Sequence, residues 1–289
     1  MSPWVSASAD LENRLVTPAD AGFPAALRDV RPAVKTLWFR GDLPRPDEPA
    51  VAIVGARAAR LPACGLAAEL AAVAARAGFA VVSGGALGID AAAHAGALDA
   101  GGRTFAVLGC GVDVVYPDRH AALFQRIVRG GGLLSDFPPG TEAHRRHFPS
   151  RNRLVAGLAR AVLVVEAWQR SGALITARLA RQLDRPLYAV PGSAGTDALL
   201  AGGKAQAVRD GADWLAVLTG QPRPILTPPA ELAALVAAVR GGAAASQVAR
   251  HLAVPLPVAL ALLSEAELAG WILRGPGGVY TSTEVTLAS

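Results

Sequence analysis

The sequence predicts an α/β protein with a Rossmann-like, doubly wound, mainly parallel sheet, followed by a small C-terminal winged-helix domain. Short apolar runs alternate with Ala- and Leu-rich stretches between residues 36 and 218. Those runs are apolar throughout, as in strands that helices cover on both faces, and such strands form parallel sheets. The Pro-rich stretch TGQPRPILTPP then ends this pattern and indicates a domain boundary.

Taken in order, TLWFRG (36–41) predicts a strand at an edge of the sheet. Six further strands follow, each separated from the next by a stretch typical of a crossover. They are expected at 51–55, 79–85, 104–111, 131–136, 161–167 and 187–192.

Four segments are expected along the chain. Residues 1–35 are too few and too polar for a domain and should pack as an N-terminal extension. Residues 36–220 form the Rossmann-like domain, 221–228 a linker, and 229–289 the winged-helix domain. In this last domain we expect helices at 231–240, at 246–252 with Ser246 as N-cap, and at 255–270, then two strands around the turn in WILRGPGGVYTS (271–282).

Composition narrows the class of protein. With 52% hydrophobic residues and a net charge of +5 in 289 residues, the chain is an ordinary globular protein. Cys64 and Cys110 lie far apart without a CxxC pattern, so neither a zinc site nor a disulfide is expected. The N-terminus lacks the features of an export signal and no apolar run reaches 18 residues, which predicts a cytoplasmic protein without a membrane partner.

The strand ends predict where the ligand binds, because an open α/β sheet binds ligands outside the carboxyl ends of its strands. Arg57 follows the strand at 51–55 without a GxGxxG or Walker pattern, so its charge suits a phosphate, unless it is only a surface arginine. Ser83, Gly84 and Gly85 precede a helix expected from about Leu87, whose free N–H groups attract anions.

The stretch HRRHFPSRNR (144–153) places Arg145, Arg146, Arg151 and Arg153 around Phe148. Arginines neutralise phosphates and an aromatic ring stacks on an unpaired base, so the stretch favours single-stranded DNA. The alternative is a solvated basic loop with Phe148 turned into the core.

Two further groups admit a chemical and a structural interpretation. Ser171 and Gly172 open a helix and favour phosphate binding, since no GxSxG elbow surrounds Ser171 to make it a nucleophile. Asp90 and His94 share a helix face and could be an acid/base pair or metal ligands, but we favour a role in fixing the loop. No catalytic residue, metal site or cofactor is therefore expected.

Six motifs, GAR (55–57), SGGALGIDAAAH (83–94), VLGCGVDVVYP (107–117), FPSRNR (148–153), VVEAWQRSGALITA (164–177) and AVPG (189–192), occur together in one order. Through the identity and order of these motifs, the chain resembles the DNA-processing protein DprA (Smf) family over about residues 20–218. The resemblance implies a homodimeric Rossmann-like protein of natural transformation. Such a protein binds incoming single-stranded DNA, protects it, and loads the RecA recombinase onto it without catalysing a reaction.

Matched by motif, the resemblance implies a set of DNA-binding residues. The sequence departs from the family where GSR reads GAR, SGLA reads SGGA, SE reads Ser135-Asp136, and G-x-N reads Gly203-Lys204. The implied contacts are Arg57, Ser83, Gly84, Gly85, Phe148, Arg151, Asn152, Arg153, Ser171 and Gly172, with Arg145, Arg146 and Lys204 as secondary contacts.

Two rival functions can be weighed from the sequence. Related Rossmann-like enzymes cleave nucleoside monophosphates with a PGGxGTxxE segment, but here PGSAGTDAL places Leu199 where the glutamate would act, and an apolar side chain is no general acid or base. A transcription regulator needs a basic recognition helix, whereas residues 252–273 contain no Arg or Lys and include Glu265 and Glu267. We therefore expect the winged-helix domain to bind either another protein or its own main domain.

Overall fold

The computed structural model describes residues 12–222, 230–268 and 271–282, and the chain separates into two compact units, residues 1–222 and 223–289. Most of the segment expected as a linker, from residue 223 to 228, lies outside the described residues.

The first unit contains a sheet of nine strands among the described residues, in the order β1-β2-β6-β5-β4-β3-β7-β8-β9. All neighbours from β6 to β9 pair in parallel, while β2 is antiparallel to β6 and to β1. This confirms the doubly wound, mainly parallel α/β fold. The strands are β1 (Arg14–Val16), β2 (Leu37–Gly41), β3 (Ala50–Val54), β4 (Ala80–Ser83), β5 (Thr104–Val107), β6 (Gly131–Ser135), β7 (Ala161–Val164), β8 (Leu187–Ala189) and β9 (Gln206–Ala207).

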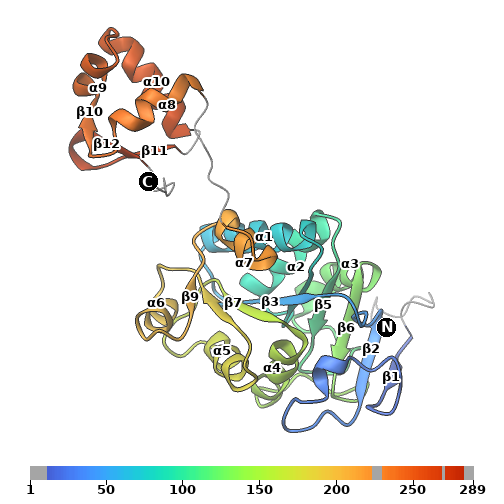
Figure 1. Ribbon diagram of the computed structural model, residues 1–289. Coiled ribbons are helices and arrows are strands. Elements are labelled where there is room, and N and C mark those ends of the chain that lie inside the picture. Colours follow the sequence, from blue (N-terminus) through green and yellow to red (C-terminus); the bar gives the residue numbers. More distant parts are fainter. Residues whose placement is uncertain (1–11, 223–229, 269–270, 283–289) are drawn as a thin grey trace. The chain divides into compact units, whose positions relative to one another are not determined.

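Helices cover both faces of this sheet (Figure 1), as the apolar strands require. In β3, Ala52 and Val54 pack beneath α4 and α5, whereas Val51 and Ile53 pack beneath α1, α2 and α7. The α-helices are α1 (Leu61–Arg76), α2 (Ile89–Asp99), α3 (Ala121–Arg129), α4 (His147–Leu158), α5 (Gly172–Gln182), α6 (Ala194–Ala201) and α7 (Gly211–Thr219), and short 3₁₀ turns lie at Ala25–Leu27 and Asp118–His120.

The prediction that residues 36–41 form an edge strand is wrong. β2 lies between β6 and β1, and β1 comes from the segment that was expected only to pack on the domain. Three residues are too few for a recognisable strand pattern. The same segment also buries Phe23, Leu27 and Val30 in the core, so it is part of the main hydrophobic cluster.

The strand order places a topological switch point at β3. The chain proceeds from β3 through β4 and β5 to β6 on one side, and then returns to place β7 and β8 on the other side. The connections that follow β3 and β7 therefore diverge, and the crevice between them is where an open α/β sheet binds its ligand.

The second unit has helices α8 (Ala230–Ala238), α9 (Ala245–His251) and α10 (Leu256–Leu268) and a three-stranded antiparallel sheet of β10 (Ala243–Ala244), β12 (Val279–Ser282) and β11 (Ile272–Arg274). The expected helices and final hairpin are present, with a 3₁₀ turn at Pro276–Gly278. Ser246 is not the N-cap, because α9 starts one residue earlier, and Gln247 instead accepts a hydrogen bond from the Ala244 amide at 2.7 Å.

Of the residues described, no single helix is long and apolar enough to span a membrane; the α9–α10 pair, bent by 107°, passes that test only when counted together.

Candidate functional site

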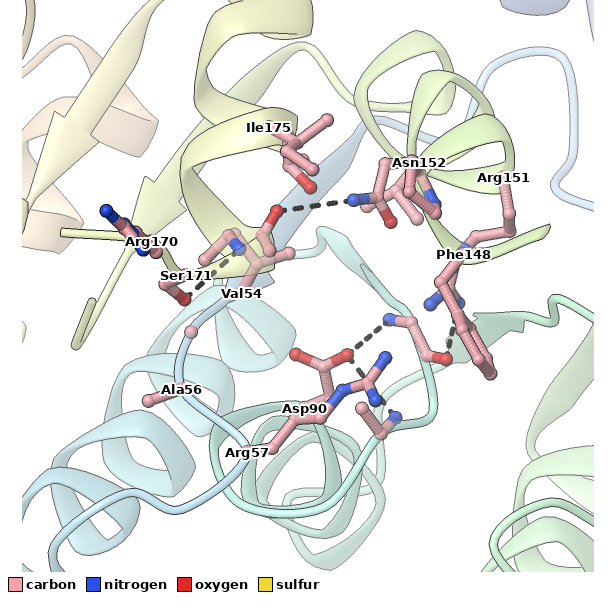
Figure 2. Close-up of a pocket in the computed structure, with 18 of the residues that line it drawn as sticks. Val54, Ala56, Arg57, Asp90, Phe148, Arg151, Asn152, Arg170, Ser171 and Ile175 are labelled. Atoms are coloured by element: carbon pink, nitrogen blue, oxygen red, sulfur yellow. Dashed lines mark hydrogen bonds between the residues drawn. The ribbon is translucent and has the colours of Figure 1, made fainter. Parts of the chain in front are cut away.

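A pocket of about 650 Å³ lies at the carboxyl edge of the sheet, beside the switch point. The loops after β3, β4 and β7 and the first turns of α4 and α5 enclose it (Figure 2). The pocket brings together eight of the residues that the sequence predicts for the site: Arg57, Gly84, Arg145, Phe148, Arg151, Asn152, Ser171 and Gly172.

Arg57 and Phe148 form a cation–π pair at the centre of this edge. The guanidinium of Arg57, an exposed residue just after β3, lies 4.7 Å from the centre of the Phe148 ring. Gly109 packs on the same ring so closely that a Cβ there would lie 2.9 Å from it. The ring thus holds the Arg57 charge in place, and a phosphate can reach that charge because the residue is exposed.

The loop after β4 is fixed between two buried charges. The Asp90 carboxylate accepts hydrogen bonds from the Gly84 and Ala86 amides at 3.1 and 3.3 Å, and the Arg151 guanidinium donates to the Gly84 and Val107 carbonyls. A Cβ on Gly84 would lie 2.6 Å from both charged groups, so only glycine fits between them. Asp90 therefore positions the loop, as we favoured from the sequence.

Burial affects the ionisation of both charged groups. It lowers the pKa of Arg151 to about 10, against the opposing influence of Asp90, so the guanidinium stays protonated at neutral pH. It raises the pKa of Asp90, and the nearby Arg151 charge and the loop amides counteract this shift. The Asp90 carboxylate thus occupies two amides of the loop before α2, and α2 begins at Ile89 and not near Leu87, with the Ile89 amide donating to the Ala56 carbonyl.

Arg151 and Arg153 have a different environment from the one expected. The stretch 144–153 is not a basic loop, since α4 starts at His147 and turns both arginines inward. Arg151 is 3% and Arg153 8% exposed, and Arg153 pairs with Asp136 at 2.5 Å. Both residues are thus largely shielded from solvent, although Arg151 keeps a small part of its surface in the pocket. The exposed cations lining the pocket are Arg57, Arg145 and Arg170.

The N-terminus of α5 forms the opposite wall. The Ser171 hydroxyl caps the helix by accepting a hydrogen bond from the Ala173 amide at 3.3 Å. Asn152 bridges the two walls, because its side-chain amide donates to the Gly172 carbonyl at 3.3 Å. Figure 2 shows Ser171 and Arg170 on one side of the pocket and Phe148 and Arg151 on the other. The Ser171 and Leu174 amides also donate within this turn, to the Trp168 and Ser171 carbonyls.

The remaining expected residues do not line this pocket. Ser83 is fully buried and its hydroxyl donates to the Ile53 carbonyl at 2.6 Å, so it is not accessible to a ligand. Gly85 lines a second, smaller recess that adjoins the pocket at Arg57. Arg146 and Lys204 are exposed but line neither of these two hollows, and Lys204 precedes β9, away from the carboxyl edge.

The sequence reasoning missed three residues at this site. Trp168 and Arg170 line the pocket from the loop after β7, and Tyr116 lines the small recess. A signal was available for the first two, because AWQRSG places an aromatic residue and an arginine just before a helix start. That combination is the one that drew attention to Phe148.

Other candidate groups for chemistry have structural partners. His94 is buried and shares a 2.7 Å hydrogen bond with the Thr104 hydroxyl. Burial lowers the pKa of His94 to about 3, so it is neutral near pH 7. Within the part of the chain that the structure describes, no cluster of three or more His, Cys, Asp or Glu side chains could hold a metal ion. Leu199, in α6, is partly buried and packs against the main hydrophobic core.

Fold and site together define a doubly wound α/β binding protein whose pocket at the switch point combines arginines, aromatic rings and a helix N-terminus. The family model for DNA recombination-mediator protein A matches residues 14–219, and the chain belongs to this family. A putative DNA processing protein DprA from Mycobacterium tuberculosis is 48% identical over 193 residues, which are 62% of this chain and 49% of the relative. The chain thus spans about half the length of that relative.

Two solved structures are similar to the first unit. DNA processing protein A from Streptococcus pneumoniae matches with a TM-score of 0.67 and 37% identity, over 71% of this chain and 74% of that one. The Helicobacter pylori protein, whose structure was described for its single-stranded DNA binding mode, matches with a TM-score of 0.65 and 31% identity, over 72% and 96% of the two chains.

Proposed function

We propose that the pocket binds single-stranded DNA and that the protein mediates recombination with it. The observation that carries this proposal is the lining of the pocket, where three exposed arginines, Arg57, Arg145 and Arg170, surround a half-buried phenylalanine and an exposed tryptophan. Arginines that neutralise phosphates, combined with rings that stack on bases, suit unpaired DNA. The binding described for the Helicobacter pylori relative supports the same ligand.

The finer role follows from the family. The protein would act in natural transformation in the cytoplasm as a homodimer, protecting incoming single strands and loading RecA onto them. It would do so without catalysis and without a cofactor. In support, Leu199 is an apolar residue packed against the core, and the Ser171 hydroxyl serves as a helix cap.

The test compares binding and recombination in one preparation. Fluorescence anisotropy with labelled oligothymidylate and with a duplex of equal length should show tighter binding of the single strand and a steep loss of affinity with salt. The full chain should also speed RecA filament formation. Equal affinity for both DNAs, or release of ribose 5-phosphate from AMP above background, would contradict the proposal.

For the second unit we propose a winged helix that contacts protein. Its third helix, α10, exposes Leu256, Val258 and Leu260, at 45%, 45% and 42%. A DNA-recognition helix needs side chains that donate hydrogen bonds to phosphates and bases, and the apolar side chains at these three positions donate no hydrogen bonds. Removing residues 230–289 should leave the affinity for duplex DNA unchanged; a clear loss would indicate that this unit binds DNA.

A further inference from the structure

Of the Phe, Tyr and Trp side chains in the described part of the chain, two are exposed, Tyr116 at 44% and Trp168 at 51%. Each lines a different hollow of the carboxyl edge, Trp168 the main pocket and Tyr116 the small recess. The two hollows adjoin at Arg57 and Phe148, which line both. Exposed rings on the two sides of a positive charge offer apolar surfaces that an incoming ligand can cover.

Phe148, the ring expected to stack on a base, is already covered by its neighbours. The Arg57 guanidinium lies over it at 4.7 Å, the Tyr116 ring is centred 5.6 Å away, and Gly109 packs on it closely. The Phe148 side chain therefore supports Arg57 and Tyr116. The rings that remain open for a base are those of Tyr116 and Trp168.

The sheet gives the spacing of the strand ends from which the connections carrying these rings extend. Tyr116 lies in the connection after β5 and Trp168 in the connection after β7, and β4 and β3 lie between those two strands. Three strand spacings are about 14 Å. At a rise of 3.4 Å per nucleotide this is about four stacked nucleotides.

We propose that a bound single strand crosses this edge from Trp168 to Tyr116, with a base stacked on each ring and Arg57 holding the phosphates between them. This inference rests on the proposed binding of single-stranded DNA and adds two contacts to it. Stacking tolerates any base, so these contacts would confer affinity without sequence preference.

The test uses the full chain and labelled oligothymidylate. Tyr116→Ala and Trp168→Ala should each weaken binding about 5- to 150-fold, the range for losing one stacked base. The salt dependence of both variants should equal that of wild type, because stacking releases few counterions. Tyr116→Phe and Trp168→Phe, which keep a ring, should bind nearly as wild type.

Two controls separate this inference from a general effect. Leu15→Ala removes an exposed apolar side chain from β1 and should not change the affinity. Thermal unfolding should show that the alanine variants remain folded. Oligothymidylate should also quench the tryptophan fluorescence of the wild-type chain by stacking on Trp168. Trp168→Phe should abolish this quenching.

The outcomes distinguish the two proposals. Wild-type affinity in both alanine variants, beside a loss in Arg57→Ala, overturns the stacking path and leaves the proposed function intact. A loss in only one variant also overturns the path, since the strand would then occupy one side of Arg57. If the wild-type chain does not bind oligothymidylate, the proposed function fails first.

Discussion

Replacing Arg57 by alanine removes the charge at the centre of the pocket. The guanidinium extends from the loop after β3 and lies 4.7 Å from the centre of the Phe148 ring, and the residue is exposed. Because no buried partner depends on this charge in the contacts described above, its loss should leave the fold intact. Any change in DNA binding can then be assigned to the contact itself.

The expected magnitude follows from one lost phosphate contact. A hydrogen bond to a charged group contributes about 1.5–3 kcal/mol, and the exposure of Arg57 argues for the lower end, a loss of about tenfold in affinity. The slope of log affinity against log salt should become shallower by about 0.7, the value for one phosphate on a single strand.

The assay is a salt titration of oligothymidylate binding followed by fluorescence anisotropy. Arg57→Lys keeps the charge and should retain the slope while losing part of the affinity, because a lysine lacks the planar contact with the ring. Arg76→Ala is the matched control, since this exposed arginine lies at the other end of α1, about 24 Å along the helix. An unchanged slope in Arg57→Ala, or an equal change in Arg76→Ala, would refute the reasoning.

Three further predictions concern the interior. Arg151→Met should lower the free energy of unfolding by about 3–5 kcal/mol, because it leaves Asp90 without its buried counter-charge. The same substitution should leave the salt dependence of DNA affinity unchanged. A shallower salt dependence would mean that Arg151 contacts phosphates. The pKa of His94 is about 3 in the folded protein and about 6.5 when unfolded, so the unfolded chain binds more protons between these values. The free energy of unfolding should therefore decrease as the pH is lowered from about 6.5, by up to about 1.4 kcal/mol per pH unit. In denaturant titrations His94→Gln should reduce this pH dependence, and a pH profile identical to that of wild type would contradict the prediction. Trp214→Ala should lower the free energy of unfolding by about 3–5 kcal/mol in the same assay, because the side chain is fully buried between α7 and the sheet. A loss below about 1 kcal/mol would show that the surrounding side chains fill the space left by the ring.

The strands and the edge that carries the site could be predicted because their signals are local. Apolar runs such as 51–54 are buried on both faces, and that burial is what a parallel sheet requires. Ser171 and Gly172 were expected at a helix start, and α5 does begin there. The edge strand β1 was missed, because three residues pair by tertiary contact and not by any pattern of their own.

The assignment of single side chains was less successful, since it depends on orientation. Four arginines occur between residues 145 and 153, but the start of α4 at His147 decides which of them are exposed. Arg145 precedes the helix and is exposed, whereas Arg151 and Arg153 lie on its inner face. In the same way the position of Ser83 in β4 directs its hydroxyl to the Ile53 carbonyl.

By itself the sequence determined the α/β fold, the family motifs and the edge of the sheet where the pocket lies, because hydrophobic periodicity and helix starts depend on neighbouring residues. Only the tertiary structure decided which charges are free. It buried Arg151 against carbonyls of two different strand ends, held Arg57 over Phe148, and left Tyr116 and Trp168 exposed on either side. The physical reason is that exposure of a side chain depends on the packing of segments far apart in the chain.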